Sequence, residues 1–450
     1  MPVCCLMMGV LLMGTAQAQE RQLTFSAKNH DLDNNDNFSP GGHYLCYDTR
    51  EFIGPGIENS DAIEMVELAT GKETLLYRPE TTITGTGAAP GVGAVSFSPV
   101  AMEVAFIHGP PVEQVPTRGY YGKPNRNGAS VPADGTGKRT WLDFRDVATD
   151  RPTTPGAHRG GTHRHEYARD GRRIGFTYDD FLLPQYDRTI GYLERHPKAP
   201  GGASHWFAIL VAVVPKGQAK PDEIERAWGD SWVDRAGTMR AFIGNVREPD
   251  GTYAQSLFVV DIPPDVDITT ANAGSAAQFP TPPGGVHVRR LTQDYAEGIV
   301  RGSYDGTRIA YYGKDAEGRL QLYVIPADGS SGGTQVTRFE TGAGPGLRWH
   351  PSDTALFCTS ENAIVATCVE KGARFGKSTW LTERGGPERK NLVVSPDGRL
   401  IAYNRTAPTR NAEGKPVKTY AGADPLQIFL VDTGIPEACL RSESPTEDEG

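Results

Sequence analysis

The sequence predicts an all-β protein, a β-propeller of six to seven four-stranded blades, with seven favoured. Three observations lead to this prediction. A short turn phrase recurs along the chain, an alternating apolar run follows each copy, and helical periodicity is scarce. The 450 residues include 53 glycines and 34 prolines, as expected for many short strands joined by tight turns. A propeller of this length forms one domain, which we place at residues 19–436.

The repeated phrase is an apolar or aromatic residue followed by Ser-Pro-x-Gly or a variant of it. An inner strand ends there, a turn of the Pro-Asp-Gly kind reverses the chain, and an alternating strand follows. Apart from one longer interval, the copies are separated by about 45 to 90 residues, a spacing typical of propeller blades. They lie at residues 38–42, 97–99, 168–171, 303–306, 350–353 and 395–398.

Three further elements complete the predicted ring. The longest interval, between Asp170 and Asp305, is expected to hold a divergent blade that begins at residue 204. That blade brings the count to seven. A helix is predicted over residues 221–232, where a proline stands at the start. Residues 21–25 are expected to add an outer strand to the last blade, which would remove the open edge of the ring.

The two ends of the chain differ from the propeller in composition. Residues 1–18 contain a short apolar run that ends in Ala16-Gln17-Ala18, the pattern of a cleaved signal peptide. The run is too short for a comfortable membrane span, so no stable membrane insertion is expected. Cleavage after Ala18 would place the protein in the periplasm or outside the cell. Residues 437–450 form an acidic segment that we expect to be flexible.

Charge and cysteine content exclude several classes of function. The formal net charge is −9 and no long basic run is present, which argues against nucleic acid and anionic lipid as partners. Loss of residues 1–18 would leave four of the six cysteines, too few for a disulfide framework. Cys358 and Cys368 flank a predicted hairpin whose register puts Cys358 opposite residue 365. Buried thiols are therefore favoured over a bridge, which stays an alternative.

The turn phrase and its blades resemble the TolB-like propeller superfamily over nearly the whole mature chain. Other segments resemble more closely a bacterial secreted propeller family that is catalogued as a domain of unknown function. The resemblance implies a fold and an address outside the cytoplasm, but no reaction, because propellers serve as scaffolds, receptors and enzymes alike. The segments are 23–40, 106–110, 159–171, 176–180, 204–206 and 221–228.

Innermost strands line the channel of a propeller, so their polar residues are the candidates for a ligand site. Counting back from the turn phrase places His163 and His165 on one inner strand and Asp36 on the first. His205 is expected on the inner strand of the divergent blade, and Arg301 on the next. In a strand, side chains two residues apart point to one face at a separation of about 6.5 to 7 Å.

The His-x-His pair could therefore share one ion if another blade supplied a third ligand. This predicts a divalent metal site, with Mn, Ca or Zn as the metal, made by His163, His165, His205 and Asp36. His108 and His158 are further candidates for the third ligand. The alternative is that the histidines hydrogen-bond neighbouring blades or water.

The segment Gly161–His165 is also similar, more weakly, to oligogalacturonate lyases, whose propellers hold manganese through histidines and a glutamine. This chain has Gly160 at the position of that glutamine, which leaves the metal and the reaction open. The resemblance implies β-elimination on a uronate, in which the ion acidifies the C–H bond. His205 or His108 would take the proton, and Arg50 or Arg301 would clamp the carboxylate.

Two hypotheses for the function result. The first is a site for a saccharide-like small ligand in the channel of a secreted propeller, with a metal-dependent carbohydrate lyase as its enzymatic form. The alternative is a non-enzymatic TolB-like propeller that binds a protein or peptide of the cell envelope. The sequence contains no Gly-x-Ser-x-Gly elbow, no His-Glu-x-x-His helix and no phosphate-binding loop, so neither hypothesis uses those chemistries.

Overall fold

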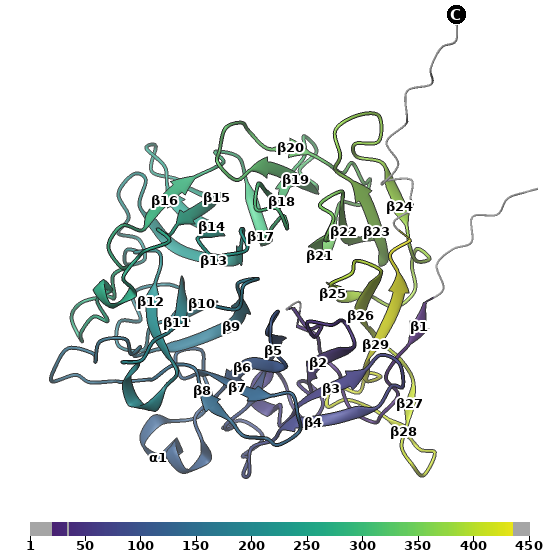
Figure 1. Ribbon diagram of the computed structural model, residues 1–450, viewed down its shortest axis with the longest axis horizontal. Helices are drawn as coiled ribbons and strands as arrows, with labels where there is room; N and C mark the ends of the chain where they lie inside the picture. Colours follow the sequence, from purple (N-terminus) through teal and green to yellow (C-terminus); the bar gives the residue numbers. More distant parts are fainter. Residues whose placement is uncertain (1–19, 34–35, 435–450) are drawn as a thin grey trace, which may run out of the picture.

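Residues 20–33 and 36–434, which the computed structural model describes, form seven four-stranded blades around a central channel (Figure 1). The chain passes from blade to blade around the ring, and within each blade it runs from the channel outward. All the pairings within the blades are antiparallel. The predicted fold class and the favoured count of seven blades are confirmed.

The strands of the first four blades are given from the channel outward. Blade 1 consists of the bridged segments 31–33 and 36–38, β2 (Tyr44–Asp48), β3 (Ile63–Glu67) and β4 (Glu73–Tyr77). Blade 2 consists of β5 (Val92–Phe97), β6 (Glu103–His108), β7 (Asn127–Pro132) and β8 (Thr140–Trp141). Blade 3 consists of β9 (Gly161–Tyr167), β10 (Arg173–Asp179), β11 (Thr189–Arg195) and β12 (His205–Ile209). Blade 4 consists of β13 (Ile224–Trp232), β14 (Met239–Arg247), β15 (Tyr253–Asp261) and β16 (His287–Arg290).

The remaining strands complete the ring. Blade 5 consists of β17 (Ala296–Gly302), β18 (Arg308–Lys314), β19 (Leu320–Pro326) and β20 (Thr334–Gln335). Blade 6 consists of β21 (Gly344–Trp349), β22 (Ala355–Ser360), β23 (Ala363–Cys368) and β24 (Ser378–Trp380). Blade 7 consists of β25 (Lys390–Val394), β26 (Leu400–Thr406), β29 (Leu426–Asp432) and β1 (Arg21–Gln22). Between β26 and β29 the chain forms a small additional hairpin, made of β27 (Thr409–Arg410) and β28 (Pro416–Val417).

Helical structure in the described chain is limited to single turns in the connections. They are the short helix α1 (Val115–Arg118) and the 3-10 turns η1 (Ile57–Asn59), η2 (Val112–Gln114), η3 (Pro200–Gly202) and η4 (Ile268–Thr270).

The N-terminal strand closes the ring as predicted. Arg21 of β1 stands opposite Leu430 of β29, and the Leu23 amide donates to the carbonyl of Ile428 over 2.8 Å. Glu20 adds an ion pair with Arg389 of the last blade at 2.6 Å. Because the first and last parts of the chain share one sheet, the outer edge of β29 is covered.

The hydrophobic core is a set of layers between adjacent blades. One layer joins Cys46 and Ile63 of blade 1 to Val95 and Phe106 of blade 2. Similar clusters join the other neighbouring pairs, including the last blade to the first. Strands buried on both faces are rich in Val, Ile and Phe, which suit a pleated surface packed from two sides.

Two predicted elements were wrong. Residues 221–232 do not form a helix, because Ile224–Trp232 is strand β13. Gly229 has a left-handed backbone at φ 65° and the pairing shifts beside it, so buried side chains fall three or four residues apart and imitate a helical period. Residue 204 does not begin the divergent blade, since β12 is the outer strand of blade 3.

The cysteine predictions are confirmed in part. Cys46 and Cys358 are free and buried, and Cys358 stands opposite Val365. Cys368 is disulfide-bonded, so its interpretation as a free thiol was wrong. The predicted signal peptide at residues 1–18 and the acidic segment at 437–450 lie outside the described residues. Within residues 20–33 and 36–434, the helices are all too short to cross a bilayer.

Candidate functional site

The inner strands share a local distortion that decides where their side chains point. In the described chain, each inner strand contains one residue with a left-handed backbone. In blades 2 to 7 the pairing with the next strand shifts at that point. Such a bulge interrupts the two-residue alternation of side chains. The left-handed residues are Asp33, Ala94, Arg164, Gly229, Gly298, Gly346 and Asn391.

This bulge separates the two imidazoles of the His-x-His pair. Arg164 lies between them at φ 60°, and the register shifts across it. Nδ1 of His163 is 3.3 Å from Nη1 of Arg126, whereas Nε2 of His165 is 3.1 Å from the Thr162 hydroxyl. The expectation that the pair faces one ion was therefore wrong, because it assumed an uninterrupted strand.

The other candidate histidines, His205, His108 and His158, have partners outside the innermost strands. His205 belongs to the outer strand β12, where Nδ1 is 2.7 Å from the Ser204 hydroxyl, so its predicted inner position was wrong. Nε2 of His108, on the second strand of blade 2, is 2.9 Å from the Tyr77 hydroxyl. Nε2 of His158 is 3.3 Å from Asp143.

The described residues contain no group of three or more His, Cys, Asp or Glu side chains that could hold a metal ion. The predicted set of His163, His165, His205 and Asp36 is thus not assembled. Burial lowers the pKa of His165 and His205 to about 4. Burial and then the neighbouring arginines, Arg126 foremost, hold the pKa of His163 well below its usual range.

A cavity of about 320 Å³ occupies one end of the channel, where the inner strands run into the repeated turns. We call this end the turn mouth. Residues from all seven blades line it within the described chain. Its polar lining includes Asp36, Glu166, Ser231, Arg301 and Arg348, and its walls include Trp232, Tyr304 and Trp349. Arg301 therefore faces the channel as predicted, and Asp36 faces it without a metal-binding partner set.

Glu166, one of the carboxylates at the turn mouth, is already engaged by the chain's own groups. Glu166 lies 3.2 Å from Arg301 and 3.0 Å from Arg240, and it accepts a hydrogen bond from Ser231 over 2.7 Å. Burial by itself would raise the pKa of Glu166, but Arg240, Arg164 and Arg301 lower it to about 2. Glu166 is therefore ionised and has little basicity left for proton transfer.

Positive charge exceeds negative charge at this depth of the channel. Arg301 and Arg348 are both buried, at 6% and 5% exposure. Burial and the neighbouring charges of Arg348 and Arg164 lower the pKa of Arg301. Burial lowers the pKa of Arg348 to about 10, against the opposing attraction of Asp36. A buried cation beside other cations is stabilised by any anion that enters.

Arg164 is a further buried arginine whose charge acts on Glu166. Its side chain is 9% exposed, and Nη1 donates to the Asp230 carbonyl over 2.7 Å. Within the described residues its Nε and Nη2 atoms are buried without a hydrogen-bond partner. Such groups are rare in folded proteins and mark places where a ligand or water completes the bonding.

Comparisons with known proteins place the chain in a family. The family model described as "Protein of unknown function (DUF3748)" matches residues 91–198. The uncharacterized protein YidR of Escherichia coli (strain K12) is 31% identical over 420 residues, which cover 85% of this chain and 94% of that protein. The chain belongs to the DUF3748 family. The predicted resemblance to a propeller family of unknown function is thereby confirmed.

Solved structures give weaker similarities to this DUF3748 chain. A protein described as TolB from Agrobacterium tumefaciens has a TM-score of 0.40 and 14% identity, over 83% of this chain and 98% of that one. A prolyl endopeptidase has a TM-score of 0.48 and 11% identity, over 92% of this chain and 50% of that one.

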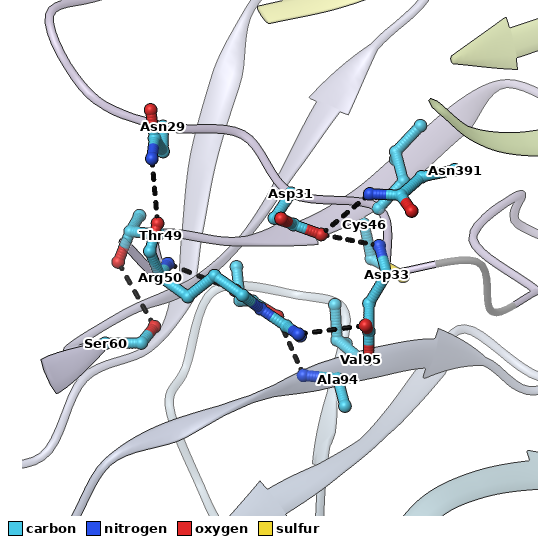
Figure 2. Close-up of polar contacts among 12 residues, drawn as sticks. Asn29, Asp31, Asp33, Cys46, Thr49, Arg50, Ser60, Ala94, Val95 and Asn391 are labelled. Atoms are coloured by element: carbon cyan, nitrogen blue, oxygen red, sulfur yellow. Dashed lines mark hydrogen bonds and ion pairs between the residues drawn. The ribbon is translucent and has the colours of Figure 1, made fainter. Parts of the chain in front are cut away.

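The opposite end of the DUF3748 channel holds a compact charged cluster around Arg50 (Figure 2). Its Nη1 lies 2.9 Å from Asp33, and its Nε donates to Asp48 over 2.7 Å. Asp48 also accepts the Ala94 amide over 2.7 Å, which connects blade 1 to blade 2. Arg50 is therefore engaged by two carboxylates of the chain itself. To clamp a substrate carboxylate, as predicted, it would have to break these two ion pairs.

Sequence reasoning missed Glu166, Ser231 and Arg348, although a signal for them was present. Each stands two residues before the residue that opens a turn, as Arg301 stands before Ser303. The openers at 168, 233, 303 and 350 all donate a backbone hydrogen bond across their turn. Reading every repeat at that position, instead of searching for histidines, would have found the channel-facing set.

Proposed function

We propose that this DUF3748 protein is a binding propeller that captures a small anionic, saccharide-like ligand at the turn mouth, with a uronate as the ligand class. The observation that carries the proposal is the pair of buried guanidiniums, Arg301 and Arg348, that face a cavity lined by all seven blades of the described chain. Guanidinium groups bind carboxylates with charge-assisted hydrogen bonds, and those bonds gain strength where water is excluded.

The size and walls of the cavity suit a sugar ring. A volume of about 320 Å³ lies within the range of small-molecule sites. Trp232 and Trp349 use their indole N–H groups on backbone carbonyls, of Glu166 at 3.0 Å and of Arg301 at 2.8 Å. Both rings are thereby fixed in orientation in the wall of the cavity, where each residue is 3% exposed.

We propose binding and assign no catalytic step to the chain's own residues. Of the described residues that line the turn mouth, none is a histidine, and Glu166 is a weak base. Of the predicted proton acceptors, His108 lies on the second strand of blade 2 and His205 on the outermost strand of blade 3. The proposed location is the periplasm or the extracellular space, supported by the signal-peptide pattern at residues 1–18.

Titration calorimetry with galacturonate, and with galactose as the neutral reference, tests the proposal. We expect galacturonate to bind and galactose not to bind. Arg348→Gln should weaken galacturonate binding about tenfold or more, since one charge-assisted contact is lost. Arg399→Gln is the matched control, because Arg399 is 84% exposed. Absence of saturable galacturonate binding, or equal binding of galactose, would overturn the proposal.

A second candidate is a peptide or protein of the cell envelope as the occupant. It is favoured by the rim of the turn mouth, where Pro40, Pro99 and Pro396 lie with the exposed side chains of Val100 and Tyr304. Apolar rim surface is typical of protein interfaces. A partner captured from envelope extract that is lost in Val100→Glu, together with no galacturonate binding, would favour this candidate.

A further inference from the structure

A second cavity of about 360 Å³ lies at the periphery of blades 2 and 3. It is formed where α1, the connection that follows β8 and the turn η3 meet. In Figure 1 α1 lies at the outer margin of the ring, beyond β7 and β8. The lining includes Thr117, Arg118, Asn127, Trp141, Phe144 and Arg145. This cavity shares no described lining residue with the turn mouth.

Arg118 is held in the cavity wall entirely by neutral acceptors. Its Nε donates to Asn125 over 3.2 Å, Nη1 to Gln114 over 3.1 Å and Nη2 to Asn127 over 2.9 Å. Amide oxygens fix the guanidinium plane without neutralising its charge. Among the described residues, no carboxylate lies within 4.0 Å of it as an ion pair.

Arg145 is held in the same way. Its Nε donates to the Gly160 carbonyl over 3.0 Å and its Nη2 to the Pro124 carbonyl over 3.2 Å. Its guanidinium lies 5.0 Å from the ring centroid of Phe181. The described chain gives it no salt bridge either, so two oriented cations share one cavity.

Asp143, the carboxylate among the described lining residues, is already committed. It accepts hydrogen bonds from Asn127 at 2.8 Å, the Gly128 amide at 3.0 Å and Thr162 at 2.7 Å. Burial by itself would raise its pKa, but His158, His165 and the Thr162 hydrogen bond hold the pKa well below its usual range. Its charge is therefore used to join blade 2 to blade 3.

The burial of the two arginines lowers the pKa of both side chains. Burial lowers the pKa of Arg118 to about 10 against the attraction of Asp143, and burial followed by the like charge of Arg118 lowers the pKa of Arg145 to about 10. Both remain charged at neutral pH, but their charged forms are destabilised relative to water. An anion between them would reverse this destabilisation, as it does for paired arginines at oxyanion sites.

We propose that this peripheral cavity binds an oxyanion of the sulfate or phosphate type, either free or carried on a sugar ring. Arg118 and Arg145 would hold the oxyanion, and Trp141 and Phe144 would contact a ring attached to it. Gly201 of η3 packs against Phe144 so closely that an added Cβ would come within 2.0 Å of the ring, which brings this loop onto the cavity. The site is separate from the turn mouth and does not depend on the function proposed for it.

Calorimetry with inorganic sulfate and with galactose 6-sulfate tests this assignment and distinguishes the two sources. We expect saturable binding, with the sugar sulfate tighter if the aromatic wall contributes and equal if the ligand is the free oxyanion. Arg118→Gln and Arg145→Gln should each weaken binding about tenfold or more. Arg151→Gln is the matched control, since Arg151 is 53% exposed in the same connection and pairs with Asp146. If neither probe binds saturably, the proposal is overturned. It is also overturned if Arg348→Gln loses sulfate binding while Arg118→Gln retains it, because the sulfate would then bind at the turn mouth.

Loss of binding in the arginine variants could also result from misfolding. A variant that leaves the buried hydrogen bonds intact tests for this. Thr117 is exposed at the cavity, and its side chain donates to the Gln114 carbonyl over 3.1 Å. Thr117→Glu introduces an internal anion beside Arg118 and should abolish sulfate binding without lowering the melting temperature. Thr117→Gln is its neutral counterpart and should bind. Equal binding by these two variants would overturn the proposal.

Discussion

Buried arginine–carboxylate networks connect neighbouring blades at the level of single residues. Arg240 has no exposed surface and lies 3.0 Å from Glu166 of blade 3, while its Nε donates to Asp230 over 2.7 Å. Gly175 on β10 leaves room for this guanidinium, because a Cβ there would lie 2.0 Å from its central carbon. Arg240 of blade 4 thus neutralises the charge of Glu166, a carboxylate of blade 3 that also faces the channel.

Replacing this arginine should destabilise the protein strongly. Arg240→Met leaves Glu166 and Asp230 buried with less countercharge, so we expect a loss of about 3 to 5 kcal/mol in the free energy of unfolding. Urea denaturation followed by tryptophan fluorescence measures it. Arg399→Met, on the exposed surface, should change stability by less than about 0.5 kcal/mol. Equal losses in the two variants would contradict the role given to the network.

At the level of elements, two features distinguish the blades from identical copies of one repeat. They are the bulge in the inner strands and the N-terminal strand that closes the last blade. The left-handed residue is glycine in three blades, but it is Arg164 in blade 3, where backbone strain accompanies a charged side chain held at the channel. The closing strand relies on packing as well as pairing. Leu23, which follows β1, is 4% exposed and belongs to the core layer between blades 7 and 1.

Truncating Leu23 should weaken the closure of the ring. Leu23→Ala removes buried apolar surface next to β29, and we expect a loss of about 2 to 4 kcal/mol in the free energy of unfolding. Phe25→Ala, two residues on, is the control, since Phe25 is 65% exposed. Chemical denaturation gives the stability, and gel filtration reports association through an uncovered β29 edge. A Leu23→Ala protein as stable as Phe25→Ala would argue against closure by this segment.

For the whole molecule, buried neutral histidines set the response to acid. Burial lowers the pKa of His108 to about 3 and those of His165 and His205 to about 4. The unfolded chain takes up these protons near pH 6.5, whereas the folded chain does not, so unfolding becomes easier as pH falls from about 6.5 to 4. Asp48 acts in the opposite sense, because burial raises its pKa to about 6 despite Arg50. These three histidines, together with His163, whose pKa is also held well below its usual range, outweigh this one carboxyl.

We therefore expect the free energy of unfolding to decrease between pH 7.5 and pH 5, by up to about 1.4 kcal/mol per pH unit for each histidine. His205→Gln should make the decrease shallower by removing one of these histidines. His287→Gln should not, because the side chain of His287 is 71% exposed. Urea midpoints at several pH values measure the slopes. Identical slopes for the native protein and His205→Gln would refute this account of the histidines.

The sequence by itself determined the propeller, a count of six to seven blades with seven favoured, the closing N-terminal strand and the inner-strand position of Arg301. These follow from local rules, since a turn phrase and an alternating strand need only neighbours in the chain. Only the tertiary structure decided that His163 and His165 diverge, because a single left-handed residue reverses which face a side chain takes. It alone decided the pairing of Arg240 with Glu166, which lie 74 residues apart and meet because adjacent blades pack together. Charge balance at the centre of a ring depends on every blade at once, which a local pattern does not encode.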